Sequence, residues 1–88
     1  MRLDVFLKAA GLAKTRTLAK ALCDKNRIIL NGQTAKASKE IKEGDVLEID
    51  YGTKKIKIII RKVPESKNIP RKERKELYEL TEIERKWF

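Results

Sequence analysis

The fold is decided by the stretch Arg27-Ile28-Ile29-Leu30-Asn31-Gly32-Gln33-Thr34-Ala35, which contains the strongest local signal in this chain. Asn-Gly between two β-prone runs is typical of a type I′ turn, because both central residues of that turn need a positive φ. The stretch therefore predicts a tight hairpin with Asn31 and Gly32 at its turn. The segments on both sides of the hairpin must then cover its apolar face.

Two helices are expected before the hairpin. Apolar residues recur every three to four positions in residues 3–10 and again in residues 18–22, which is the spacing of a helix face. Gly11 suits the end of the first helix, and Thr15 is a suitable N-cap for the second. The expected core residues of the helices and the hairpin are Leu3, Phe6, Leu7, Leu18, Leu22, Ile28 and Leu30.

Strands and a helical tail are expected after the hairpin. Residues 46–51 and 55–63 alternate between apolar and charged side chains, as half-buried strands do. The order of elements predicts an α+β fold with a mostly antiparallel sheet over residues 1–63. Residues 64–88 are interpreted as a linker and a C-terminal helical tail that folds back on the body. The tail's apolar stripe has a three-to-four spacing and consists of Leu77, Leu80, Ile83 and Trp87.

Charge and composition restrict the classes of function that this chain could have. The chain has 88 residues and a formal net charge of +9, and residues 1–62 hold 15 Lys+Arg against 7 Asp+Glu. Such an excess favours a polyanionic partner such as nucleic acid. The sequence contains no His and no glycine-rich phosphate loop, so we expect neither catalysis nor a metal or cofactor. It shows no apolar run that could span a membrane. Cys23 is the single cysteine and cannot form an internal disulfide, so we expect the reducing cytoplasm as its location. Its side chain is expected to be buried.

Cations gather where the helices are expected to begin. Lys14 and Arg16 flank Thr15 at the start of the second helix, whose free N–H groups already carry partial positive charge. The conflict disappears if a phosphate binds there, because helix N-termini bind anions readily. The alternative is that both side chains simply extend into water. Arg2 stands in the same position at the start of the first helix.

Five short motifs occur in order along residues 1–50: Arg2-Leu3-Asp4, Lys14-Thr15-Arg16, Asn31-Gly32, Lys36-Ala37-Ser38 and Gly44-Asp45. Their order and spacing resemble the S4 RNA-binding domain. The resemblance implies two helices packed on a small twisted sheet, with a basic groove that binds structured RNA. The RNA-binding residues that it implies are Arg2, Lys14, Thr15, Arg16, Lys20, Lys36 and Lys39, with Lys8 and Arg27 as weaker additions.

The short chain is similar to the free-standing members of the S4 family that act on bacterial ribosomes. That similarity implies a monomeric, non-catalytic factor that binds large-subunit ribosomal RNA and peptidyl-tRNA on split large subunits. Its implied protein partner is the factor that adds C-terminal alanines in ribosome-associated quality control. The alternatives are a general recycling or heat-shock factor on large subunits, a DNA-binding helix-turn-helix module, and an RNA-modifying enzyme or a detached part of one.

Three further features of the sequence lead to structural predictions. Asp4 is expected to stabilise the start of the first helix or to pair with a nearby cation. The face formed by Lys55, Lys57 and Arg61 either extends the RNA surface or keeps an exposed sheet in water. Replacement of Arg16 by Ala is expected to leave stability unchanged or to raise it slightly, because it removes a cation from the positive pole of a helix.

Overall fold

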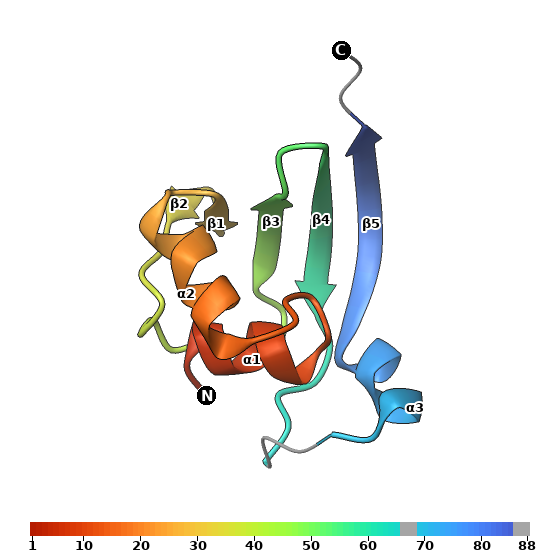
Figure 1. The fold of residues 1–88 in the computed structure, drawn as a ribbon. Helices are drawn as coiled ribbons and strands as arrows, with labels where there is room; N and C mark the ends of the chain where they lie inside the picture. Colours follow the sequence, from red (N-terminus) through yellow and green to blue (C-terminus); the bar gives the residue numbers. More distant parts are fainter. Residues whose placement is uncertain (66–68, 86–88) are drawn as a thin grey trace.

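The computed structural model describes residues 1–65 and 69–85. Two helices come first, and the remaining elements are mainly strands (Figure 1). In chain order the elements are α1 (Leu3–Ala9), α2 (Arg16–Asp24), β1 (Ile28–Leu30), β2 (Gln33–Thr34), β3 (Val46–Asp50), β4 (Lys54–Ile60), α3 (Arg71–Arg74), the 3-10 helix η1 (Lys75–Leu77) and β5 (Tyr78–Arg85). The predicted α+β class is confirmed.

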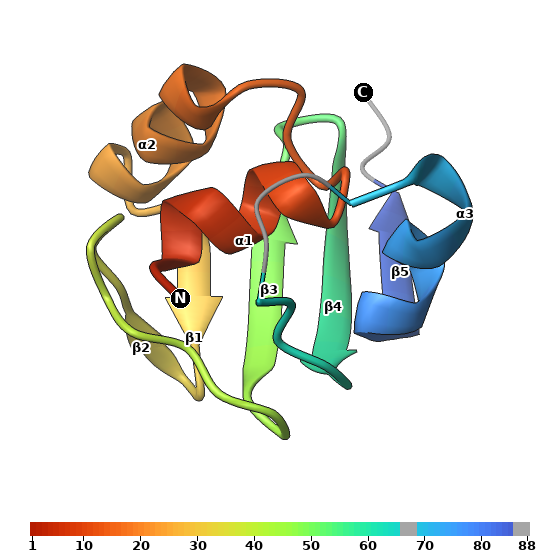
Figure 2. The ribbon, with the colours of Figure 1, turned by 90° about the horizontal axis from the view of Figure 1, so that it is seen from below.

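The strands form one five-stranded sheet in the order β2-β1-β3-β4-β5, in which every neighbouring pair is antiparallel. Helices α1 and α2 lie on the same face of this sheet, and α1 crosses over the central strands (Figure 2). The start of α1 and all of α2 lie towards β1 and β2. The segment with α3 lies at the opposite edge, beside β5.

The predicted hairpin is confirmed. Asn31 has φ 50° and Gly32 has φ 84°, the two positive values that a type I′ turn requires. Asn31 also ties this turn to the next strand, because its Nδ2 donates to Asp45 at 3.1 Å and its Oδ1 accepts from the Val46 N–H at 2.9 Å. The asparagine therefore serves both the turn and the docking of β3.

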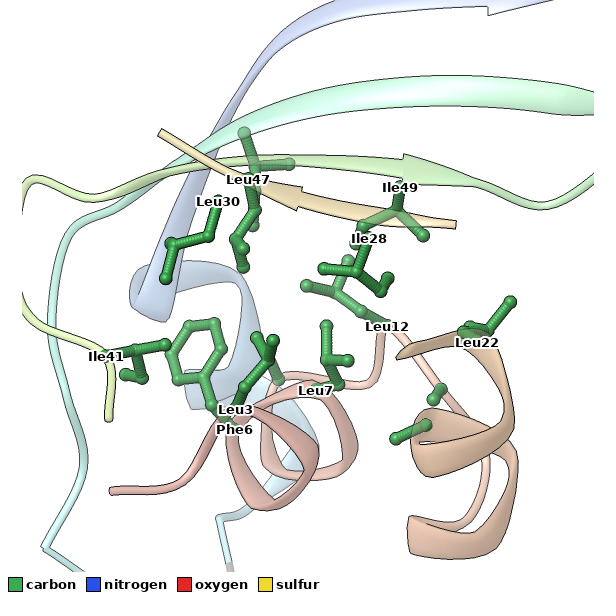
Figure 3. Packing of buried hydrophobic residues seen from close by; sticks show 14 of the residues in the cluster. Leu3, Phe6, Leu7, Leu12, Leu22, Ile28, Leu30, Ile41, Leu47 and Ile49 are labelled. Carbon is green, nitrogen blue, oxygen red and sulfur yellow. The ribbon is translucent and has the colours of Figure 1, made fainter. Parts of the chain in front are cut away.

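The core lies between α1 and the sheet (Figure 3). Its largest side chains with at most 1% exposure come from α1, β1, β3 and β4: Leu3, Phe6, Leu7, Ile28, Leu47, Ile49, Ile58 and Ile60. The prediction of Leu18 as a core residue is wrong, since its side chain is 44% exposed. Helix α2 instead buries Ala19, Leu22 and Cys23. This stripe is one residue further along the helix, which turns Leu18 towards solvent.

The helical tail expected for residues 71–88 is also corrected. Among residues 69–85, only residues 71–77 are helical, and Tyr78–Arg85 forms the edge strand β5. The register against β4 shifts, so that Ile56 opposes Ile83 whereas Ile58 opposes Leu80. This bulge lets Leu80 and Ile83 share one face although they are three residues apart, a spacing that resembles a helix. The tail docks on the body as expected, but as a strand; Trp87 and Phe88 lie outside the described residues.

Candidate nucleic-acid interface

Cationic side chains from three separate segments line one surface hollow, with a volume of about 510 Å³, which we call the basic hollow. Arg2 comes from the start of α1, Lys20 from the middle of α2, and Lys36 from the loop after β2. Ser38, whose side chain carries a hydroxyl group, also lines this hollow. Hydroxyl groups and cationic side chains together are typical of phosphate contacts.

A smaller hollow of about 280 Å³ adjoins the basic hollow. Lys36 and Ser38 line both hollows, and Lys39 lines only the smaller one. The two hollows therefore form a continuous surface along the loop after β2. This surface brings together four of the seven predicted site residues, which are Arg2, Lys20, Lys36 and Lys39.

Backbone hydrogen bonds hold this loop against the start of α1. The Leu3 N–H donates to the Lys39 carbonyl at 2.8 Å, and the Asp4 N–H donates to the Ala37 carbonyl at 3.1 Å. Two N–H groups at the start of α1 are thus already satisfied within the protein. Arg2 therefore acts beside a loop of fixed position, and the first turn of α1 does not itself offer these two N–H groups to an anion.

The start of α2 has a different arrangement. The Thr15 hydroxyl oxygen accepts from the Leu18 N–H at 3.0 Å, which confirms Thr15 as the N-cap. Its hydroxyl hydrogen remains available as a donor. Lys14 precedes the cap and is exposed. Neither Lys14 nor Thr15 lines the basic hollow or the hollow that adjoins it, and both are exposed.

Asp4 joins the two predicted arginines. Its side chain is 1% exposed, and its Oδ1 accepts from the Val5 N–H at 2.8 Å. The Nε of Arg2 lies 3.2 Å from Oδ1, and the Nε of Arg16 lies 3.1 Å from Oδ2. The expected pairing of Asp4 with a cation is confirmed. Arg16, whose replacement by Ala was expected not to lower stability, thus has a buried structural partner in Asp4.

The outer face of the sheet is balanced in charge. Lys55 lies 3.6 Å from Glu48, and Arg61 forms an ion pair with Glu79. Lys57 stands opposite Glu82 of β5 in the register of the sheet. These acidic partners favour the interpretation of a charge-paired surface in water over an extension of the RNA surface. The sequence could not reveal Glu79 and Glu82 as partners because the tail was expected to be helical.

The weaker additions Lys8 and Arg27 line neither hollow of this surface. Lys8 is exposed on α1, and the Nη1 of Arg27 lies 3.7 Å from Asp50 at the end of β3. A different hollow of about 440 Å³, which sequence reasoning missed, lies between the end of α1 and β5. Its walls include Leu80 and Ile83, which are 46% and 52% exposed.

Cys23 lines the basic hollow but is buried, as expected. Burial, and secondarily the negative charges of Asp4 and Asp24, raise the pKa of its thiol to about 11. The thiol therefore stays protonated near neutral pH and packs as a small apolar group. Across residues 1–65 and 69–85, no group of three or more His, Cys, Asp or Glu side chains could hold a metal ion. Within the same part of the chain, no helix has the length and apolar character to cross a membrane.

Comparison with known proteins agrees with this geometry. The S4 domain family matches residues 1–47. The protein named RQC P-site tRNA stabilizing factor from Halalkalibacterium halodurans is 45% identical over 84 residues, which cover 96% of this chain and 93% of that protein. The protein of the same name from Helicobacter pylori (strain 26695) is 44% identical over 73 residues, with 83% of this chain and 87% of that protein covered.

A solved structure is similar as well. The structure described as trimeric Vibrio cholerae heat shock protein 15 superposes with a TM-score of 0.84 at 34% identity, covering 92% of this chain and 81% of that chain. The chain belongs to the S4 domain family and, within that family, to the group of proteins named RQC P-site tRNA stabilizing factor.

Proposed function

We propose that this protein is a non-catalytic, cytoplasmic RNA-binding factor that acts on large ribosomal subunits in ribosome-associated quality control. It binds the tRNA in the P site and large-subunit ribosomal RNA after the ribosome has split. By holding peptidyl-tRNA in place as a monomer, it supports the tailing factor that adds C-terminal alanines. The names of the relatives support the binding of P-site tRNA and the role in ribosome-associated quality control. The basic hollow supports binding through RNA phosphates.

The observation that carries the proposal is the convergence of Arg2, Lys20 and Lys36 on one hollow. These cations are distant in the sequence, and all three line one hollow together with Ser38. Arg16 lies one helical turn before Lys20, and Lys39 extends the surface along the loop. Lys14 and Thr15 complete the proposed site at its outer rim. The surface is suited to successive phosphates of a folded RNA rather than to a small substrate.

A second candidate function is that of a heat-shock or recycling factor on large subunits that carry peptidyl-tRNA. The similarity to the Vibrio cholerae heat shock protein 15 structure favours it, because it extends over 92% of this chain. Both candidates require the same basic hollow. They differ in whether alanine tailing depends on the protein.

Co-sedimentation with purified bacterial large subunits tests the proposed function. Subunits that carry P-site tRNA should bind the protein more tightly than subunits without tRNA, and a duplex DNA competitor should not displace it. Equal binding to both subunit preparations, or preferred binding to the DNA, would contradict the proposal. In a reconstituted reaction, alanine tailing should increase when the protein is added. Subunit binding without any effect on tailing would favour the second candidate.

A further inference from the structure

The carboxylate of Asp4 is a buried anion inside a cationic surface. Its two oxygens face two arginines that come from different helices, with Arg2 Nε at 3.2 Å from Oδ1 and Arg16 Nε at 3.1 Å from Oδ2. Arg2 Nη2 also lies 3.4 Å from Oδ2. One carboxylate therefore holds two guanidinium groups next to each other. Like charges repel, so without Asp4 these two groups would move apart.

The geometry leaves the outer ends of the arginines for a ligand. An arginine has five N–H donors, and Arg16 uses its Nε–H towards Asp4. Its two Nη groups carry the other four donors, and the side chain is 50% exposed. Arg2 is 46% exposed. A lysine could not divide its contacts in this way, because its single ammonium would have to serve both Asp4 and the ligand.

We propose that Asp4 is a positioning residue for RNA binding: it holds the guanidinium groups of Arg2 and Arg16 side by side so that their Nη groups bind a backbone phosphate together. This inference rests on the proposed RNA-binding function and assigns the phosphate contact to one pair of residues. Two charged donors fixed before binding lose little side-chain entropy when the phosphate arrives. A single carboxylate inside the basic surface thus strengthens the binding of an anion.

The sign of one substitution tests this proposal. Asp4→Asn raises the net charge by one, so a purely electrostatic surface would bind RNA more tightly. If Asp4 positions the arginines, the affinity for tRNA should instead fall by about 10-fold or more, the range for lost charge-assisted hydrogen bonds. Glu73→Gln is the matched control, because exposed Glu73 lies on α3, at the edge of the sheet away from the basic hollow, and its replacement changes the charge equally. The control should bind as well as the wild type or better. Tighter binding by Asp4→Asn would overturn the proposal.

A spectroscopic measurement separates positioning from folding and from RNA binding as such. In the ¹⁵N-labelled full chain, the Nε–H groups of Arg2 and Arg16 should have order parameters near those of rigid backbone, and Asp4→Asn should lower them below about 0.6. Rigid side chains in Asp4→Asn would overturn the proposal. If wild-type protein binds no RNA while both arginines are rigid, the proposed function fails and the pairing itself stands. If Asp4→Asn does not fold, Arg16→Lys serves instead: it should fold but lose RNA affinity, and wild-type affinity would refute the shared arginine.

Discussion

The Nε of Arg16 lies 3.1 Å from the Oδ2 of Asp4, and this ion pair joins the first residue of α2 to a carboxylate buried in the first turn of α1. The pair has one exposed and one buried member, since the Asp4 side chain is only 1% exposed. The same arginine therefore contributes to the packing of the two helices and to the surface that we propose for RNA.

Arg16→Ala should lower both RNA affinity and stability. RNA binding should weaken by about 1.5–3 kcal/mol, the range for charge-assisted hydrogen bonds. The free energy of unfolding should fall by about 1–2 kcal/mol, because buried Asp4 keeps only Arg2 as a charged partner and half-exposed Arg16 is partly screened by solvent. Urea unfolding and fluorescence anisotropy with labelled tRNA measure the two effects.

Lys72→Ala is the control for Arg16→Ala. It removes one positive charge from an exposed position on α3, at the edge of the sheet away from the basic hollow. It should leave stability unchanged and affect RNA binding by much less than Arg16→Ala. Equal losses of RNA affinity in the two variants would mean that only total charge matters, and the site assignment would then be wrong.

RNA affinity should depend steeply on salt. The proposed site contains six cations: Arg2, Lys14, Arg16, Lys20, Lys36 and Lys39. If about five phosphates are neutralised, the logarithm of the association constant should fall with the logarithm of salt concentration at a slope of roughly −3 to −5. Lys36→Ala should make this slope shallower by about 1. A slope near zero, measured by anisotropy titrations at several salt concentrations, would show that the surface does not bind phosphates.

Cys23 should make stability fall at high pH. Burial raises the pKa of its thiol from the ordinary value of 9.0 to about 11, so the folded state holds the proton more tightly than the unfolded state. The stability from this difference is fully present below pH 9 and is lost as the pH rises through 11. Urea unfolding between pH 8 and 11 should therefore show a decline that is smaller in Cys23→Ala. An identical decline in both proteins would assign the effect to other groups, such as Tyr51, whose pKa burial raises to about 12.

The sequence predicts those parts of the fold whose signal is local. The Asn31-Gly32 turn needs two positive φ values at adjacent residues, and few residue pairs adopt them, so the pattern alone was sufficient. The prediction of Leu18 as a core residue was wrong because a helix of nine residues offers two nearly equivalent apolar stripes. Only the packing of Ala19 against the rest of the core decides between them.

In the tail and in the site, the sequence does not predict contacts between residues that are far apart along the chain. The bulge in β5 gives Leu80 and Ile83 a helical spacing, and it becomes visible only through the register with β4. The cations of the site could be predicted because their residue types are informative. Their convergence could not, since Asp4 and Arg16 are 12 positions apart and no local pattern indicates that they meet.

Leu77→Ala should show that the chain after the linker stabilises the whole domain. Leu77 ends η1 with 2% exposure, and its carbonyl accepts from the Arg61 N–H at 2.8 Å beyond the end of β4. Removing its buried side chain should lower the free energy of unfolding by about 2–4 kcal/mol, the range for a leucine truncated in a core. Leu80→Ala is the matched control, because Leu80 is 46% exposed in β5 and should cost less than about 1 kcal/mol. Both variants should unfold in a single cooperative transition, measured by circular dichroism. Equal and small losses in the two variants would mean that the tail does not contribute to the core in solution.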